Sequence, residues 1–131
     1  MRGRWNVLCL LAAAGCIISF ARSRSASAQT QLGLDEVSGQ KLVAANRKLN
    51  ASVAALRKHL PPSELALFDQ SQQTWYRFRT DDALFRAARF QGGSLYPTQF
   101  ALVQTELTNQ RIAELQSLQK ELKRTLGGTS N

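Results

Sequence analysis

The chain has 131 residues, with 17 Lys and Arg against 9 Asp and Glu, two cysteines and one histidine. Four of the basic residues and both cysteines lie in the first 28 residues, so the remainder has 13 basic against 9 acidic residues, a net charge of +4. With His59 and no cysteine in that remainder, a zinc site of nitrogen and sulfur ligands is excluded. About 100 residues suffice to bury a core without a disulfide.

The N-terminus has the pattern of a secretory signal peptide. Two arginines precede an apolar run at residues 7–21, and Ala26-Ser27-Ala28 has the small-x-small pattern of a cleavage site. We therefore predict a signal peptide over residues 1–28, cleavage near Ala28, and a periplasmic or secreted product.

Two alternatives to this cleavage stay open. The stretch that ends at Cys16 resembles a bacterial lipoprotein box, in which Cys16 carries the lipid. The apolar run is also a candidate for a retained anchor, although it is shorter than the roughly 20 residues that cross a bilayer.

A first helix is predicted from Leu34, after a short polar lead-in at residues 29–33. Leu42, Leu49 and Leu56 recur every seven residues, which predicts a stripe that faces the core. The helix should end at Pro61-Pro62, because proline lacks the amide hydrogen that a helix needs. Its opposite face is basic and comprises Lys41, Arg47, Lys48, Arg57 and Lys58.

A second helix is predicted over residues 63–90, with Ser63 as its N-cap and Glu64 as an acid in its first turn. Gly92-Gly93 should end this helix. The aromatic residues that we expect on its core face are Phe68, Trp75, Phe78 and Phe85.

A third helix is predicted over residues 96–126, with Pro97 in its first turn and a disordered tail at residues 127–131. Its apolar stripe comprises Phe100, Val103, Leu107, Leu115, Leu118 and Leu122. No strand is predicted. The sequence therefore predicts an all-α fold, an antiparallel three-helix bundle over residues 34–126.

No catalytic, metal or cofactor site is predicted. Asp81 and Asp82 are adjacent, and adjacent residues on a helix do not face each other. We expect Asp82 to pair with Arg86 and Asp81 with Arg77. The arginines and aromatic residues of this segment are typical of nucleic-acid binding, but the helical period should send the aromatics to the core and export removes the protein from nucleic acid. No nucleic-acid partner and no enzymatic activity are expected.

Four stretches together resemble a known family: LNASVAAL, QQTWYRFRTDDA, GGS and ELTNQRIAEL, all between residues 49 and 118. They resemble the N-terminal domain of the LprI-type lysozyme-inhibitor family, which consists of small exported bacterial helical domains. The positions that match the family pattern are Leu49, Asn50, Gln72, Trp75, Arg79, Asp82, Gly92, Gly93, Ser94, Leu107, Thr108 and Arg111. The resemblance implies a protein-binding function without a cofactor.

The chain departs from the family pattern at two positions. Where the pattern has two cysteines, this sequence has Ala83 and Val103, so an apolar pair replaces the implied disulfide between the second and third helices. A disulfide that closes a loop of about 20 residues stabilises a fold by roughly 3 kcal/mol. The fold should survive this loss and be insensitive to reductant.

The polar positions of the pattern are candidates for a network or a recognition surface. They are Gln72, Trp75, Arg79, Asp82, Thr108 and Arg111. We expect Arg79, Asp82 and Arg111 to form a partly buried network that fixes the register of the two helices, since a satisfied buried polar set specifies register.

The predicted function is that of an exported helical binding module with lysozyme or another envelope protein as its partner. Animal-type lysozymes are strongly basic, so complementarity calls for an acidic inhibitor, which a net charge of +4 does not provide. The alternative function is a peripheral envelope protein whose basic face binds anionic lipid or cell-wall polymer.

Overall fold

The computed structural model describes the backbone of residues 6–127 and the side chains of residues 28–125. Its elements are the helices α1 (Asn6–Arg57), α2 (Pro62–Ala87) and α3 (Tyr96–Gly127), with a short 3-10 helix, η1 (Ala88–Phe90), after α2. No strand occurs in this part of the chain, so the predicted all-α fold of three helices is confirmed. Among the described residues, no helix combines the length and apolar character that crossing a membrane requires.

The chain divides into two units, residues 1–34 and residues 35–131, and α1 runs through the boundary. The predicted signal peptide and the alternative lipid site at Cys16 lie outside the residues whose side chains are described. The predicted helix start at Leu34 is wrong, because α1 is already helical at residues 29–33, while the predicted domain bounds stay a prediction. No proline precedes Pro61, so nothing in this stretch forces the helix to stop.

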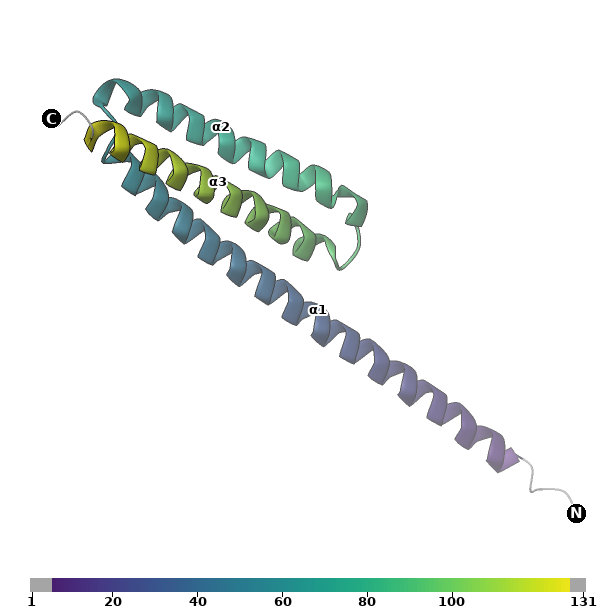
Figure 1. Cartoon of the computed structure of the whole chain (residues 1–131). Helices are drawn as coiled ribbons and strands as arrows, with labels where there is room; N and C mark the ends of the chain where they lie inside the picture. Colours follow the sequence, from purple (N-terminus) through teal and green to yellow (C-terminus); the bar gives the residue numbers. More distant parts are fainter. Residues whose placement is uncertain (1–5, 128–131) are drawn as a thin grey trace, which may run out of the picture. The chain divides into compact units, whose positions relative to one another are not determined.

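The second unit is a bundle of α2, α3 and the latter part of α1. In Figure 1, α2 and α3 lie side by side and run in opposite directions, as the short connection between them requires. The buried centre consists of Leu49 and Leu56 from α1 with Ile112 and Leu115 from α3. Burying one leucine contributes about 1.5 to 3 kcal/mol. The predicted stripe of α1 is therefore confirmed at the two leucines that form this centre.

Proline residues determine where α2 begins, and a glycine follows its end. The predicted N-cap of this helix needs one correction. Pro61 is the N-cap and Pro62 the first helical residue, so the prediction of Ser63 as N-cap is wrong. Proline fits the first helical position because the missing amide hydrogen has no intrahelical partner there. The helix ends at Ala87, η1 follows, and Gly92 then adopts a φ of +79°, which glycine accepts without strain.

The outer side of α2 carries two phenylalanines that the sequence placed in the core. Phe78 is 53% exposed and Phe85 is 77% exposed, so that prediction is wrong for both residues. Trp75 and Phe68 do pack on the core. On a helix with 3.6 residues per turn, steps of seven, three and seven residues rotate the side chains away from Phe68 by about 100° in total.

The stripe of α3 is largely confirmed. Leu107 and Leu115 are buried, and Leu122 packs against the core. Ile112, which was not predicted, is also buried. Leu118 is the exception, since it is 41% exposed. Of the predicted tail at residues 127–131, Gly127 still belongs to α3, and residues 128–131 lie outside the described residues.

Candidate functional site

Arg79 connects all three helices of the bundle. Its Nη1 donates to Asn46 Oδ1 of α1 at 2.7 Å and to Thr108 Oγ1 of α3 at 3.0 Å. Thr108 is fully buried and donates in turn to the carbonyl of Gln104 at 2.6 Å. A single guanidinium on α2 is thus hydrogen-bonded to both neighbouring helices and sets their positions along the bundle axis. Asn46 was missed in the sequence, although it lies one helical turn before Leu49 beside the apolar stripe.

No carboxylate is among the described partners of Arg79. Its guanidinium lies 5.2 Å from the ring centroids of both Trp75 and Tyr76, so the aromatic rings provide the electrostatic partner. Burial lowers the pKa of Arg79 below its ordinary value, and Tyr76 partly offsets this. The group keeps its charge at neutral pH, since arginine does not deprotonate in proteins. Its Nε is buried and has no hydrogen-bond partner among the described residues.

Arg111 of α3 makes the second polar connection to α2. Its Nε and Nη2 donate to Gln72 Oε1 at 2.9 and 2.6 Å, and its Nη1 donates to Glu114 Oε2 at 3.0 Å. The guanidinium lies 5.9 Å from the Trp75 ring centroid. Trp75 is therefore in contact with two guanidinium groups, which were predicted to belong to the same network.

Asp82 does not join Arg79 and Arg111. Its Oδ2 lies 2.9 Å from Arg86 Nε, as the spacing of four residues predicted, and Arg86 Nη1 lies 3.7 Å from Glu106 Oε2 on α3. Asp82 is thus part of an ion-pair chain that runs from its largely buried carboxylate to the exposed Glu106, and the predicted set of three residues is corrected at this position. The reason is that Arg79 points inward to Asn46 and Thr108. The expected Asp81 pair with Arg77 is absent from the ion pairs of the described residues, and both side chains are exposed.

The two positions that replace the implied cysteines lie on neighbouring helices. Ala83 of α2 is fully buried, and Val103 of α3 is partly buried. Both side chains are small and apolar and leave no buried polar atom in the interior. The predicted replacement of the disulfide by an apolar pair stays a prediction.

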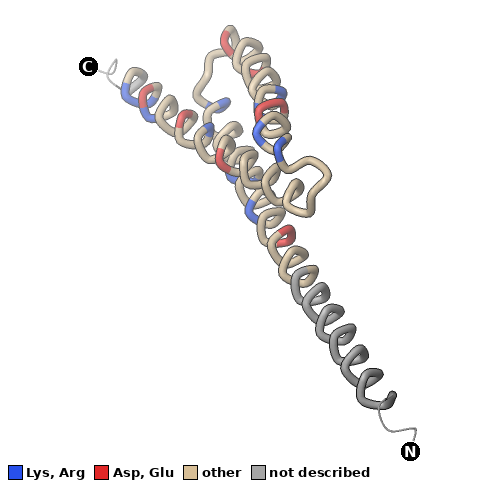
Figure 2. Tube along the Cα trace, turned by 90° about the vertical axis from the view of Figure 1, so that its right-hand side faces the viewer, with Lys and Arg blue, Asp and Glu red and all other residues tan. Residues whose placement is uncertain are grey.

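The predicted basic face of α1 is exposed but not uniform. Arg57 forms an ion pair with Asp69 of α2. Its charge is therefore compensated within the protein, whereas the prediction had it as an unpaired member of the basic face. The other four members remain exposed without an ion pair among the described residues; they are Lys41, Arg47, Lys48 and Lys58. Figure 2 shows how the basic and acidic residues are distributed along the chain.

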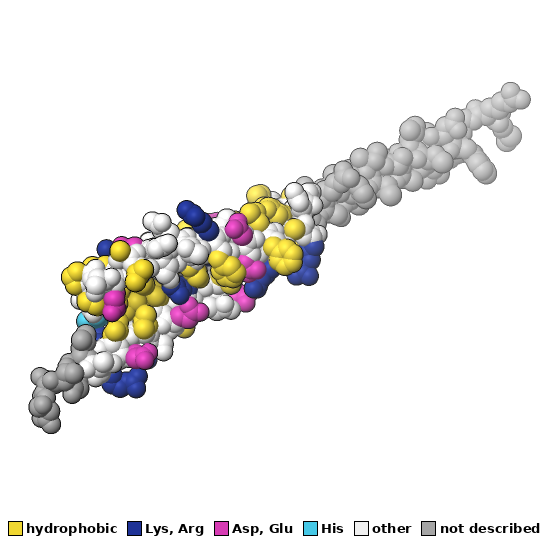
Figure 3. All heavy atoms as spheres, turned by 90° about the horizontal axis from the view of Figure 1, so that it is seen from above, with side chains coloured by type: hydrophobic (Ala, Val, Ile, Leu, Met, Phe, Trp, Pro, Cys, Tyr) yellow, Lys and Arg dark blue, Asp and Glu magenta, His cyan; other side chains and the backbone are white. Residues whose placement is uncertain are grey.

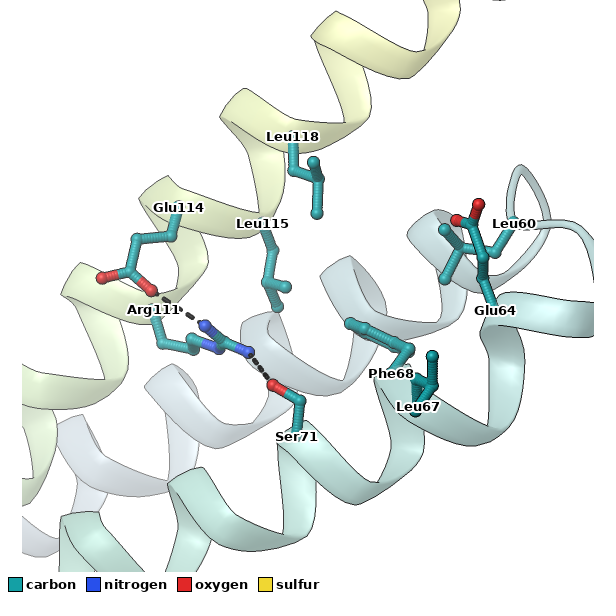
Figure 4. Close-up of a pocket in the computed structure, with 9 residues that line it drawn as sticks. All are labelled: Leu60, Glu64, Leu67, Phe68, Ser71, Arg111, Glu114, Leu115 and Leu118. Atoms are coloured by element: carbon teal, nitrogen blue, oxygen red, sulfur yellow. Dashed lines mark hydrogen bonds and ion pairs between the residues drawn. The ribbon is translucent and has the colours of Figure 1, made fainter.

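An open groove lies between the first half of α2 and the second half of α3, with a volume of about 490 Å³. Figure 4 shows the side chains of Phe68, Leu115 and Leu118 around its apolar middle, with Glu64 and Glu114 toward opposite sides. We call it the α2–α3 groove. Its lining residues are Leu60, Glu64, Leu67, Phe68, Ser71, Arg111, Glu114, Leu115 and Leu118.

A second hollow of about 510 Å³ continues the α2–α3 groove along α2 and shares Leu67, Ser71 and Arg111 with it. This hollow also includes Trp75 and the exposed Phe78. The space-filling view in Figure 3 shows hydrophobic side chains that reach the surface between charged ones. The groove was not predicted from the sequence, because apolar periodicity does not reveal where two helices leave a gap.

The arrangement is that of a binding surface. Within the described residues, no group of three His, Cys, Asp or Glu side chains is placed to hold a metal ion. What the second unit presents is a rigid helical bundle, fixed by two arginines, with an apolar groove on its surface. The fold is therefore that of a small helical bundle with an open apolar groove between two of its helices.

Comparison with known families identifies the group to which the chain belongs. Residues 21–115 match the family model described as lysozyme inhibitor LprI, which covers well over half of the chain. The chain therefore belongs to the LprI family. The family is one of inhibitors, not of enzymes. No curated protein and no solved structure matches the chain.

Proposed function

We propose that this protein is an exported helical binding module that inhibits lysozyme by protein–protein contact through the α2–α3 groove. Family membership supports the activity, and the observation that carries the location is the groove itself. Leu67 and Leu118 line it and are 67% and 41% exposed, which is costly in water unless a partner covers them. Export follows from the predicted signal peptide, with cleavage near Ala28 or lipidation at Cys16 as the two processing routes.

The activity is tested by titrating a basic animal-type lysozyme with residues 29–131, which contain the whole of the second unit and its core. We expect dose-dependent inhibition that persists at physiological salt, because ions do not screen the apolar contacts that the groove provides. Circular dichroism provides the control for folding. A folded helical protein that leaves lysozyme activity unchanged at every ratio would rule out the proposed activity.

The location is tested by the substitution Leu67→Ser, with Val43→Ser as the matched control. Both residues are similarly exposed, at 67% and 61%, but Val43 lies on α1 outside the groove. We expect Leu67→Ser to weaken inhibition about tenfold, since a central interface residue contributes more than about 1 kcal/mol. Val43→Ser should change it less than twofold. Equal effects of the two substitutions would place the contact elsewhere.

A peripheral envelope protein is the second candidate function. The observation in its favour is the set of four exposed basic residues, three on α1 and Lys58 directly after its end, without an ion pair among the described residues. Each such residue contributes about 1 kcal/mol near an anionic surface. Binding to anionic vesicles that disappears between low and physiological salt would support this function, and binding through the groove would be unaffected by the loss of these charges.

A further inference from the structure

The α2–α3 groove has an apolar middle and two exposed carboxylates. Glu114 is bonded to Arg111, yet its side chain is 63% exposed, and Glu64 is exposed in the first turn of α2. Figure 4 shows the two carboxylates on opposite sides of Leu115 and Phe68. A ligand that fills the middle therefore meets a carboxylate at each end, of which Glu64 has no ion pair among the described residues and Glu114 is paired with Arg111.

Among the described residues that line the groove, Arg111 is the only cation, and its guanidinium points toward Ser71, where hydrogen bonds hold it (Figure 4). The side chain of Arg111 is 17% exposed, and its donors are directed to Gln72, Ser71 and Glu114. It cannot offer a free guanidinium to an anionic ligand without breaking these bonds. The accessible charge of the groove is therefore negative, although residues 29–131 carry a net charge of +4.

Salt limits the distance over which one charge acts on another in solution. At physiological ionic strength, charges further apart than about 8 Å are largely screened from each other. The charged side chains that line the groove, Glu64, Glu114 and Arg111, therefore act on a ligand seated there more strongly than the net charge of the whole protein does. The net charge of +4 therefore does not prevent the groove from binding a basic lysozyme.

We propose that the α2–α3 groove binds a cationic segment of its partner, in which an apolar side chain fills the middle and lysine or arginine groups flank it. This inference rests on the proposed function and names the chemistry of the partner surface. The cations lie against Glu64 and Glu114, and their aliphatic stems cover Leu67 and Leu118. An acidic or phosphorylated partner would bring like charges together at both ends of the groove.

The test replaces both groove carboxylates in residues 29–131, as Glu64→Gln with Glu114→Gln. The control is Glu36→Gln with Glu106→Gln, which changes the net charge equally outside the groove. Glu106 resembles Glu114 in being an exposed glutamate of α3 beside an arginine. Two probes are used, a basic lysozyme and a short peptide with leucines flanked by lysines. Trp75 is the only tryptophan of residues 29–131 and reports peptide binding by its fluorescence.

We expect the groove variant to bind both probes about tenfold more weakly at physiological salt, and the control variant to stay within twofold of the original protein. A peptide with glutamates in place of the lysines should not bind. Equal binding by both variants, or binding of the glutamate peptide, would overturn the inference while leaving lysozyme inhibition intact. Loss of peptide binding in the groove variant, with no lysozyme inhibition by the original protein, would overturn the proposed function alone.

Discussion

Replacing Arg79 by alanine should destabilise the protein by about 3 kcal/mol, which lowers the melting temperature of a domain of this size by roughly 15 °C. The substitution removes the hydrogen bonds to Asn46 and Thr108 and both cation–π contacts. An unsatisfied buried polar group costs about 1 to 3 kcal/mol, and each lost cation–π contact adds about 0.5 to 1 kcal/mol. Urea unfolding of residues 29–131, followed by circular dichroism, measures the change.

Arg77→Ala is the matched control for this measurement. Arg77 lies on the same helix two residues earlier, is exposed, and has no ion pair among the described residues. We expect its replacement to change the free energy of unfolding by less than about 0.5 kcal/mol. If Arg79→Ala and Arg77→Ala have the same effect, Arg79 does not hold the three helices together.

Introducing Ala83→Cys and Val103→Cys together should give a protein that is about 3 kcal/mol more stable when oxidised than when reduced. The bridge would close a loop of about 20 residues, and the gain comes from the restricted unfolded chain. The original protein should show no such difference, since residues 29–131 contain no cysteine. Urea unfolding with and without reductant measures the gain.

The two single-cysteine variants are the controls for the bridge. Each should unfold alike with and without reductant, and thiol titration should find one free thiol in each and none in the oxidised double variant. If the double variant keeps two free thiols under oxidising conditions, these positions do not correspond to the cysteine pair of the family pattern.

The sequence predicted the features that depend on neighbours along the chain. The seven-residue repeat of Leu49 and Leu56 identified the core side of α1, and Pro61-Pro62 and Gly92 identified the turns between helices. The ion pair of Asp82 with Arg86 also follows from a spacing of four residues on one helix. These features are local, so a single sequence is enough to determine them.

The errors arise where three-dimensional packing decides between local alternatives. Phe78 and Phe85 keep a spacing that resembles a repeat, but the three-residue step before Phe78 rotates both away from the core. Arg79 was expected in one network with Asp82 and Arg111, whereas its hydrogen-bond partners Asn46 and Thr108 lie on α1 and α3, 33 and 29 residues away. Such partners depend on how the helices are aligned against each other.

The candidate site was predicted in part. The family pattern singled out Gln72, Arg79, Thr108 and Arg111, and the structure brings these residues into hydrogen bonds between helices. Of these residues, Arg111 also lines the α2–α3 groove. The groove itself exists because α2 and α3 leave a gap near Leu118. The spacing of apolar residues in the sequence does not predict such a gap.

The most direct test of the account is to map the contact with lysozyme on the backbone amides of residues 29–131 by NMR titration. If the α2–α3 groove is the docking surface, the perturbed amides will cluster at residues 64–78 and 111–118, at physiological as well as at low salt. Perturbations centred on the basic residues of α1 that vanish at physiological salt would contradict the groove and favour binding to an anionic surface.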